Sequence, residues 1–225
     1  MNNRISRRVF LQSAGSFGAL MLIRSNDFNI GSRNVPNILI IGDSISMGYT
    51  PFLKEILADK AYVWHPDENC EGTTKGVLKI DEWIGTTKWD IIHFNFGLHD
   101  LKHVNAETGA NSTLPEDPLQ ADVRQYSKNL KMIVDRLQDM EAKLIFATTT
   151  PVPEKSSPLR EPEKVLIFNK AALKIMKREH IEVNDLYAFV LPMVKEIQIA
   201  DNVHFKPEGY RALAEKVSEY LVRYL

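Results

Sequence analysis

The chain of 225 residues carries 28 lysine and arginine residues against 29 aspartate and glutamate residues, with one cysteine and 44% hydrophobic residues. This near-neutral balance argues against nucleic acid or an anionic membrane surface as a partner. One cysteine excludes an intrachain disulfide framework and a cysteine-based zinc cluster, and the length is sufficient for one domain with an ordinary hydrophobic core.

The N-terminal segment has the pattern of a targeting signal. Residues 1–24 contain four arginines and no acidic residue, and SRRVFLQ at residues 6–12 resembles the twin-arginine export motif. The apolar stretch at residues 13–23 is shorter than the roughly 20 residues of a membrane span. We therefore predict an export signal over residues 1–30, a periplasmic or extracellular protein and no stable membrane span. An amphipathic N-terminal arm is the alternative.

After this segment, short apolar runs alternate with helical patterns of apolar residues. The runs predict strands at residues 37–41, 61–64, 89–96, 142–149 and 181–183. Helices are predicted at residues 51–59, 76–84, 119–140, 162–179 and 207–225. This alternation is typical of a parallel sheet covered by helices on both faces, and no linker or repeat divides the chain. The sequence thus predicts one α/β domain over residues 36–225, with no signature of its oligomeric state.

Polar residues that follow the predicted strands are the first candidates for a site, because open α/β sheets bind ligands beyond the carboxyl ends of their strands. Ser44 lies on the turn between the first predicted strand and the helix that follows, where a helix N-terminus favours developing negative charge. A serine nucleophile needs a base that a third group orients. Asp201 and His204, three residues apart before the last helix, can supply both.

Four short segments together resemble the sequence blocks of the GDSL/SGNH hydrolase family. They are Gly42-Asp43-Ser44-Ile45, Asn69-Cys70-Glu71-Gly72-Thr73-Thr74, Gly97-Leu98-His99-Asp100 and the D-x-x-H of residues 201–204, in family order. The resemblance implies a three-layer α/β/α sandwich with a parallel, five-stranded, flavodoxin-like sheet. It also implies Ser44 as nucleophile, His204 and Asp201 as its partners, and an oxyanion hole that includes the backbone N–H groups of Ser44 and Gly72. Gly76 is the alternative to Gly72.

His99 departs from the family pattern, which has asparagine at this position of the third block. The asparagine amide donates a hydrogen bond to the oxyanion, and a neutral imidazole N–H can donate a comparable bond. We therefore expect His99 to be the third oxyanion donor.

Taken together, these features predict a serine esterase that hydrolyses carboxylic esters, with O-acyl groups on carbohydrates or small-molecule esters as substrates and no cofactor or metal. Two alternatives stay open. His99-Asp100-Leu101-Lys102-His103 is close to the H-E-x-x-H zinc motif, so a metal-dependent hydrolase could use His99 and His103. A non-catalytic glycan-binding protein with the same fold is the other.

Overall fold

The computed structural model describes residues 35–225, and the predicted export segment lies outside this range. Within it, five parallel strands form one sheet in the order β2-β1-β3-β4-β5. The strands are β1 (Asn37–Ile41), β2 (Tyr62–Trp64), β3 (Ile91–Phe94), β4 (Lys143–Ala147) and β5 (Glu182–Asn184). This is the predicted flavodoxin-like order, in which the chain reverses direction across the sheet between β1 and β3.

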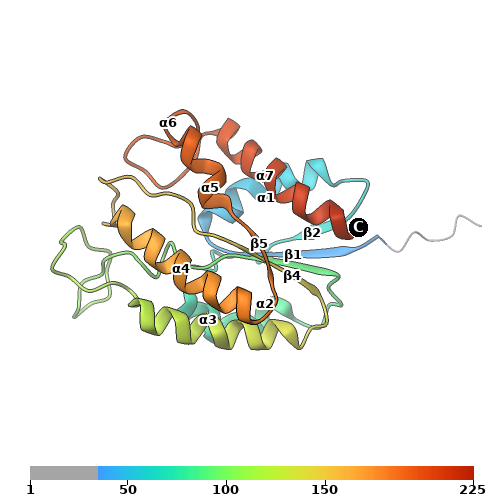
Figure 1. The fold of residues 1–225 in the computed structure, drawn as a ribbon, viewed down its shortest axis with the longest axis horizontal. Coiled ribbons are helices and arrows are strands. Elements are labelled where there is room, and N and C mark those ends of the chain that lie inside the picture. The colour runs from blue at the N-terminus through green and yellow to red at the C-terminus, as the bar shows by residue number, and fades with distance from the viewer. Residues whose placement is uncertain (1–34) are drawn as a thin grey trace, which may run out of the picture. The chain divides into compact units, whose positions relative to one another are not determined.

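Helices cover both faces of the sheet, as the strand–helix alternation predicts. Helices α1 (Ser44–Ile56) and α7 (Pro207–Leu221) pack against each other on one face, whereas α2 (Thr73–Ile84), α3 (Val123–Gln138) and α4 (Pro162–Arg178) line the other (Figure 1). The three central strands therefore have apolar neighbours above and below, whereas the edge strands β2 and β5 are partly exposed. The fold is the three-layer α/β/α sandwich that the sequence predicts.

The central strands are apolar on both faces because both faces are buried. Strand β3 is paired in register with β1 through Ile38–Ile91 and with β4 through Phe94–Phe146. The rings of Phe94 and Phe146 meet edge to face, with their centroids 5.4 Å apart. This rigid centre holds the loops at the carboxyl ends of β1 and β3.

Two regions differ from the elements expected from the sequence. Helix α1 begins at Ser44 rather than at residue 51, because the Asp43 side chain caps it and Pro51 is accommodated inside it. Between β5 and α7 the chain forms three short helical segments that were not predicted. They are α5 (Leu186–Val190), a 3-10 turn (Leu191–Met193) and α6 (Val194–Ile197). In residues 35–225, no helix combines the length and the apolar character needed to cross a membrane.

Candidate active site

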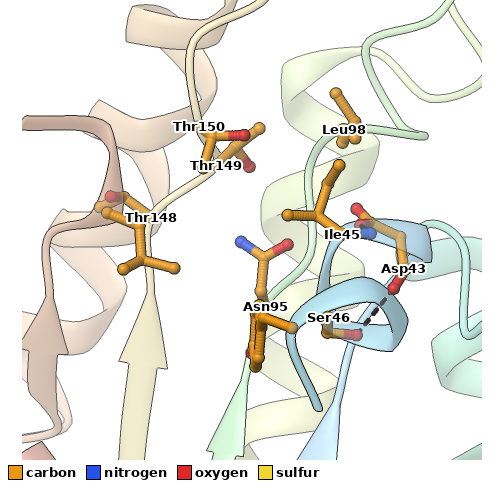
Figure 2. A pocket seen from close by; sticks show the side chains of 10 residues that line it. Asp43, Ile45, Ser46, Asn95, Leu98, Thr148, Thr149 and Thr150 are labelled. Carbon is orange, nitrogen blue, oxygen red and sulfur yellow. Dashed lines mark hydrogen bonds between the residues drawn. The ribbon is translucent and has the colours of Figure 1, made fainter. Parts of the chain in front are cut away.

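Ser44 is the first residue of α1 and lies directly beyond the carboxyl end of β1. The Asp43 carboxylate accepts a hydrogen bond from the Ile45 N–H (2.9 Å), which is the usual capping arrangement. The Ser46 hydroxyl donates to the Asp43 carbonyl oxygen (2.7 Å), and Figure 2 shows this contact beside Asn95. These bonds fix the turn, so that the half-buried Ser44 lies at the positive end of the α1 dipole.

The His204 ring comes from the loop before α7 and meets Ser44 from the other side. Nε2 of His204 lies 2.9 Å from Oγ of Ser44, although the two residues are 160 positions apart in the chain. The hydrogen-bonded pair that the sequence predicts between a nucleophile and a base is therefore present in the geometry.

Asn202, rather than Asp201, lies beside the second nitrogen of His204. Its Oδ1 is 2.8 Å from Nδ1 and also accepts the backbone N–H of His204 at 3.0 Å. The backbone donor identifies this atom as the amide oxygen, so Nδ1 must carry the ring proton and Nε2 must accept from Ser44. Asp201 is exposed, has a φ of +53°, and is not bonded to His204 in the described part of the chain. Its predicted orienting role stays a prediction.

The surroundings of His204 favour its neutral form. Partial burial lowers its pKa below the usual value, and the positive charge of Arg160 lowers it further. Arg160 is itself buried and donates through Nε to the Leu98 carbonyl oxygen (2.8 Å). A neutral imidazole can accept the Ser44 proton, which is what a general base must do.

The candidate oxyanion donors lie on loops that hydrogen bonds connect to the end of β1. The Cys70 N–H donates to the Gly42 carbonyl oxygen (3.2 Å), which holds the loop before Gly72 beside the Ser44 turn. Gly72 caps α2, and the buried Asp100 carboxylate accepts the Thr73 N–H at 2.9 Å. Because Thr73 follows Gly72 and Asp100 follows His99, this hydrogen bond connects the loops that carry the two candidate donors.

Gly97 allows the loop after β3, which carries His99, to turn towards the site. Its φ is +145°, and a Cβ at this position would lie 2.3 Å from Oγ1 of Thr149. Only glycine fits such a backbone and such a close approach. Two residues later, His99 is largely buried, which lowers its pKa to about 3, with further depression by the nearby positive charges of Lys102 and Arg160. The ring is therefore neutral at ordinary pH and has one N–H to donate.

A second serine–histidine contact supports the same turn and was missed by the sequence reasoning. Oγ of Ser46 lies 2.7 Å from Nε2 of His65, and Nδ1 of His65 donates to the Pro66 carbonyl oxygen (2.7 Å). Ser46 is only 3% exposed. Because Ser46 is buried and His65 is also bonded to the Pro66 carbonyl oxygen, this pair supports the turn structurally.

Cys70 is excluded as a nucleophile at neutral pH, since burial raises the pKa of its thiol to about 12.

The His99/His103 metal hypothesis finds no support in the arrangement of these two residues. His103 is 2% exposed, with Nδ1 2.6 Å from the Asp117 carbonyl oxygen and Nε2 3.0 Å from the Glu161 carboxylate. Both nitrogens are therefore occupied by protein partners. Among residues 35–225, no group of three or more histidine, cysteine, aspartate or glutamate side chains is placed to hold a metal ion.

A serine–histidine pair beyond the strands of an α/β/α sandwich is an arrangement found in serine hydrolases. The sequence matches the GDSL-like lipase/acylhydrolase family over residues 40–212, which is well over half of the chain. The chain belongs to this family, as the sequence blocks predicted.

Solved structures share the fold at low sequence identity. An acetyl xylan esterase, AlAXEase, is 19% identical with a TM-score of 0.67, over 82% of this chain and 99% of that one. A lipase/acylhydrolase from Enterococcus faecalis is 20% identical with a TM-score of 0.68, over 83% and 95%. A GDSL-like lipase from Bacteroides thetaiotaomicron is 16% identical with a TM-score of 0.62, over 84% and 89%. No curated protein is similar enough to the sequence to match it.

Proposed function

We propose that this protein is a serine esterase that removes acyl groups from carbohydrate esters. The observation that carries the proposal is the 2.9 Å contact between Oγ of Ser44 and Nε2 of His204, with the tautomer of His204 fixed through Nδ1. Ser44 attacks the ester carbonyl carbon as its proton passes to Nε2. His204 then gives that proton to the departing alcohol, and water removes the acyl group from Ser44 by the same steps.

Three N–H groups stabilise the oxyanion of the tetrahedral intermediate in this mechanism. The backbone N–H of Ser44 lies at the start of α1, where it has no partner within its own helix. The N–H of Gly72 and the neutral ring of His99 complete the set. Losing one such donor commonly lowers kcat by about 10²- to 10³-fold, so His99 has to replace the family asparagine as a donor and not only as a space filler.

A cavity borders the loop that carries His204, although neither Ser44 nor His204 lines it, and it offers space for a substrate larger than a simple acetyl ester. It has a volume of about 620 Å³ and is lined by Pro151, Val152, Tyr187, Leu191, Ile199 and Asp201, among others. The Ile199 N–H donates to the His204 carbonyl oxygen (3.0 Å), so one wall of the cavity is continuous with the loop that carries the histidine. This volume is in the range of small-molecule sites. The acetyl xylan esterase among the structural neighbours favours a sugar as the alcohol part.

Hydrolysis of defined esters by the purified protein tests this function. We expect release of acetate from acetylated xylo-oligosaccharides and from p-nitrophenyl acetate, with both activities lost in Ser44→Ala. Ser218→Ala, near the C-terminal end of α7, where the hydroxyl only donates to the Glu215 carbonyl oxygen, is the matched control and should keep full activity. Activity that survives in Ser44→Ala would contradict the nucleophile. Hydrolysis of p-nitrophenyl acetate without release of acetate from the acetylated xylo-oligosaccharides would contradict the carbohydrate substrate.

We also propose that the protein is exported, on the basis of the SRRVFLQ segment at residues 6–12. Fractionation of cells that express the full chain is the test. Arg7→Lys combined with Arg8→Lys should retain the protein in the cytoplasm, whereas the unchanged chain should be found outside it. Equal distribution of the two proteins would contradict a twin-arginine signal.

A further inference from the structure

The neutral ring of His99 has one proton and two nitrogens that could carry it. Nδ1 is buried and has no hydrogen-bond partner within residues 35–225, whereas Nε2 is not among the buried atoms left without a partner. The carboxylate oxygen nearest to Nδ1 is Oε2 of Glu71, at 3.9 Å, which is too far for a hydrogen bond. The position of this proton decides whether His99 can donate towards the site.

Glu71 is held at that distance by its own turn and by Lys75. Its backbone has a φ of +54°, and its N–H donates to Oδ1 of Asn69 (2.8 Å). Nζ of Lys75, in the first turn of α2, lies 3.1 Å from Oε1 of Glu71, 2.8 Å from a carboxylate oxygen of Glu68 and 2.7 Å from the Asn69 carbonyl oxygen. Lys75 thus binds three oxygens of the loop that precedes Gly72.

A carboxylate in hydrogen-bond contact with Nδ1 would change the donor properties of His99. The carboxylate accepts only, so the single proton of a neutral ring would stay on Nδ1. In the proposed oxyanion role of His99, Nε2 would then present a lone pair to the oxyanion, which repels it. A carboxylate that stays short of contact leaves the proton free to occupy Nε2.

We propose that Lys75 is a positioning residue that keeps Glu71 short of a hydrogen bond with His99 and so keeps the His99 proton on Nε2. The inference rests on the proposed role of His99 as an oxyanion donor. It assigns a role in the reaction to the ion pair between Lys75 and Glu71, although neither side chain contacts the nucleophile or the base.

Substitution of Lys75 tests the proposal in the full chain. In Lys75→Met the Glu71 carboxylate is released, and we expect kcat for p-nitrophenyl acetate to fall between about tenfold and 10²-fold with little change in KM, because a transition-state donor is lost. Lys75→Arg, which keeps the charge, should retain most of the rate. Lys79→Met, which removes the next lysine of α2 and its exposed pair with Glu82, is the matched control and should leave kcat unchanged.

The double variant Lys75→Met/Glu71→Ala separates positioning from simple loop damage. If Glu71 is the harmful acceptor, its removal should recover most of the lost rate. A double variant that is as slow as Lys75→Met, or a Lys75→Met that keeps full activity, would overturn the proposal.

Nitrogen-15 NMR of histidine-labelled protein gives a second readout that loop damage does not imitate. The His99 signals, assigned by their loss in His99→Asn, should report a proton on Nε2 in the unchanged protein and on Nδ1 in Lys75→Met. The same tautomer in both would refute the inference. Activity that persists in Ser44→Ala or in His99→Ala would instead refute the proposed mechanism, so the two failures are distinguishable.

Discussion

Oδ1 of Asn202 accepts two hydrogen bonds from His204, one from its backbone N–H at 3.0 Å and one from Nδ1 of its ring at 2.8 Å. The backbone and the side chain of the histidine are thus fixed by a single atom. This acceptor is neutral, so it selects the tautomer of His204 without the charge that a carboxylate would add to stabilise the imidazolium.

Asn202→Ala should lower kcat/KM by about 10²-fold, because the ring loses the group that places its proton on Nδ1 and its lone pair towards Ser44. Asp201→Asn should have a much smaller effect, since Asp201 is exposed and makes no hydrogen bond to His204 within residues 35–225. Steady-state kinetics of both variants with p-nitrophenyl acetate is the measurement. The opposite order of effects would return the orienting role to Asp201, as the D-x-x-H block of the family implies.

Gly72→Ala should lower kcat strongly, whereas Gly76→Ala should mainly lower stability. A Cβ at Gly72 would lie 3.0 Å from the Asp100 carboxylate, which already holds the Thr73 N–H, so the oxyanion loop must shift. We expect a loss of about 10²-fold in kcat from this shift. A Cβ at Gly76 would instead lie 2.6 Å from the side chain of Ile133 in the core.

Kinetics and urea unfolding of the two glycine variants separate the effects. Gly76→Ala should unfold at lower urea by the roughly 1–3 kcal/mol typical of an overpacked core, with the kcat of the folded fraction nearly preserved. A large kcat loss in Gly76→Ala together with an active Gly72→Ala would show that Gly76, and not Gly72, donates the N–H to the oxyanion.

The sheet and its flanking helices were predictable because their signals are local. Strands β1 and β3 are short apolar runs bounded by polar residues, and α4 and α7 begin at prolines that suit the first turn of a helix. Helix α1 is the exception: Pro51 suits a helix start, but the Asp43 side chain caps the helix at Ser44, seven residues earlier, and Pro51 lies inside it.

The contacts within the site depend on turn geometry that residue spacing does not specify. D-x-x-H places Asp201 and His204 within one turn, but the positive φ of Asp201 directs Asn202 to the histidine instead. The contact between Ser46 and His65 joins residues from two different loops, and no spacing rule predicts it. Asn202 lay inside the motif, and a side chain able to accept a hydrogen bond there was the available signal.

Arg160→Met should move the acid limb of the pH profile of kcat/KM to higher pH. The positive charge of Arg160 helps to lower the pKa of His204, so its removal raises that pKa and protonates the base at a higher pH. Arg160→Lys keeps a charge at this position and should keep the limb nearer to its original place. An unchanged limb in Arg160→Met would show that burial alone sets the pKa of His204.

Asp100→Asn should change how stability depends on pH. Burial raises the pKa of the Asp100 carboxyl from 3.8 to about 6, even though Thr73 donates to it. The folded protein therefore holds this proton up to about pH 6, whereas the unfolded chain releases it near pH 4. The unfolded state binds fewer protons in this window, so the contribution of Asp100 to the free energy of unfolding falls as pH rises from 4 to 6.

Urea unfolding of wild type and Asp100→Asn at several pH values between 4 and 7 measures this contribution. The free energy of unfolding of the wild type, relative to the variant, should fall by roughly 3 kcal/mol over the window, because each pKa unit corresponds to about 1.4 kcal/mol. His93 and His99 are present in both proteins, so their own titrations cancel in the difference, which also contains the mutual repulsion between Asp100 and Asp43. Asp59→Asn, at an exposed position, controls for the loss of one negative charge. A difference that grows with pH would mean that the folded state stabilises the Asp100 carboxylate, and a constant difference would mean that folding leaves the pKa of Asp100 unchanged; either result would contradict a raised pKa.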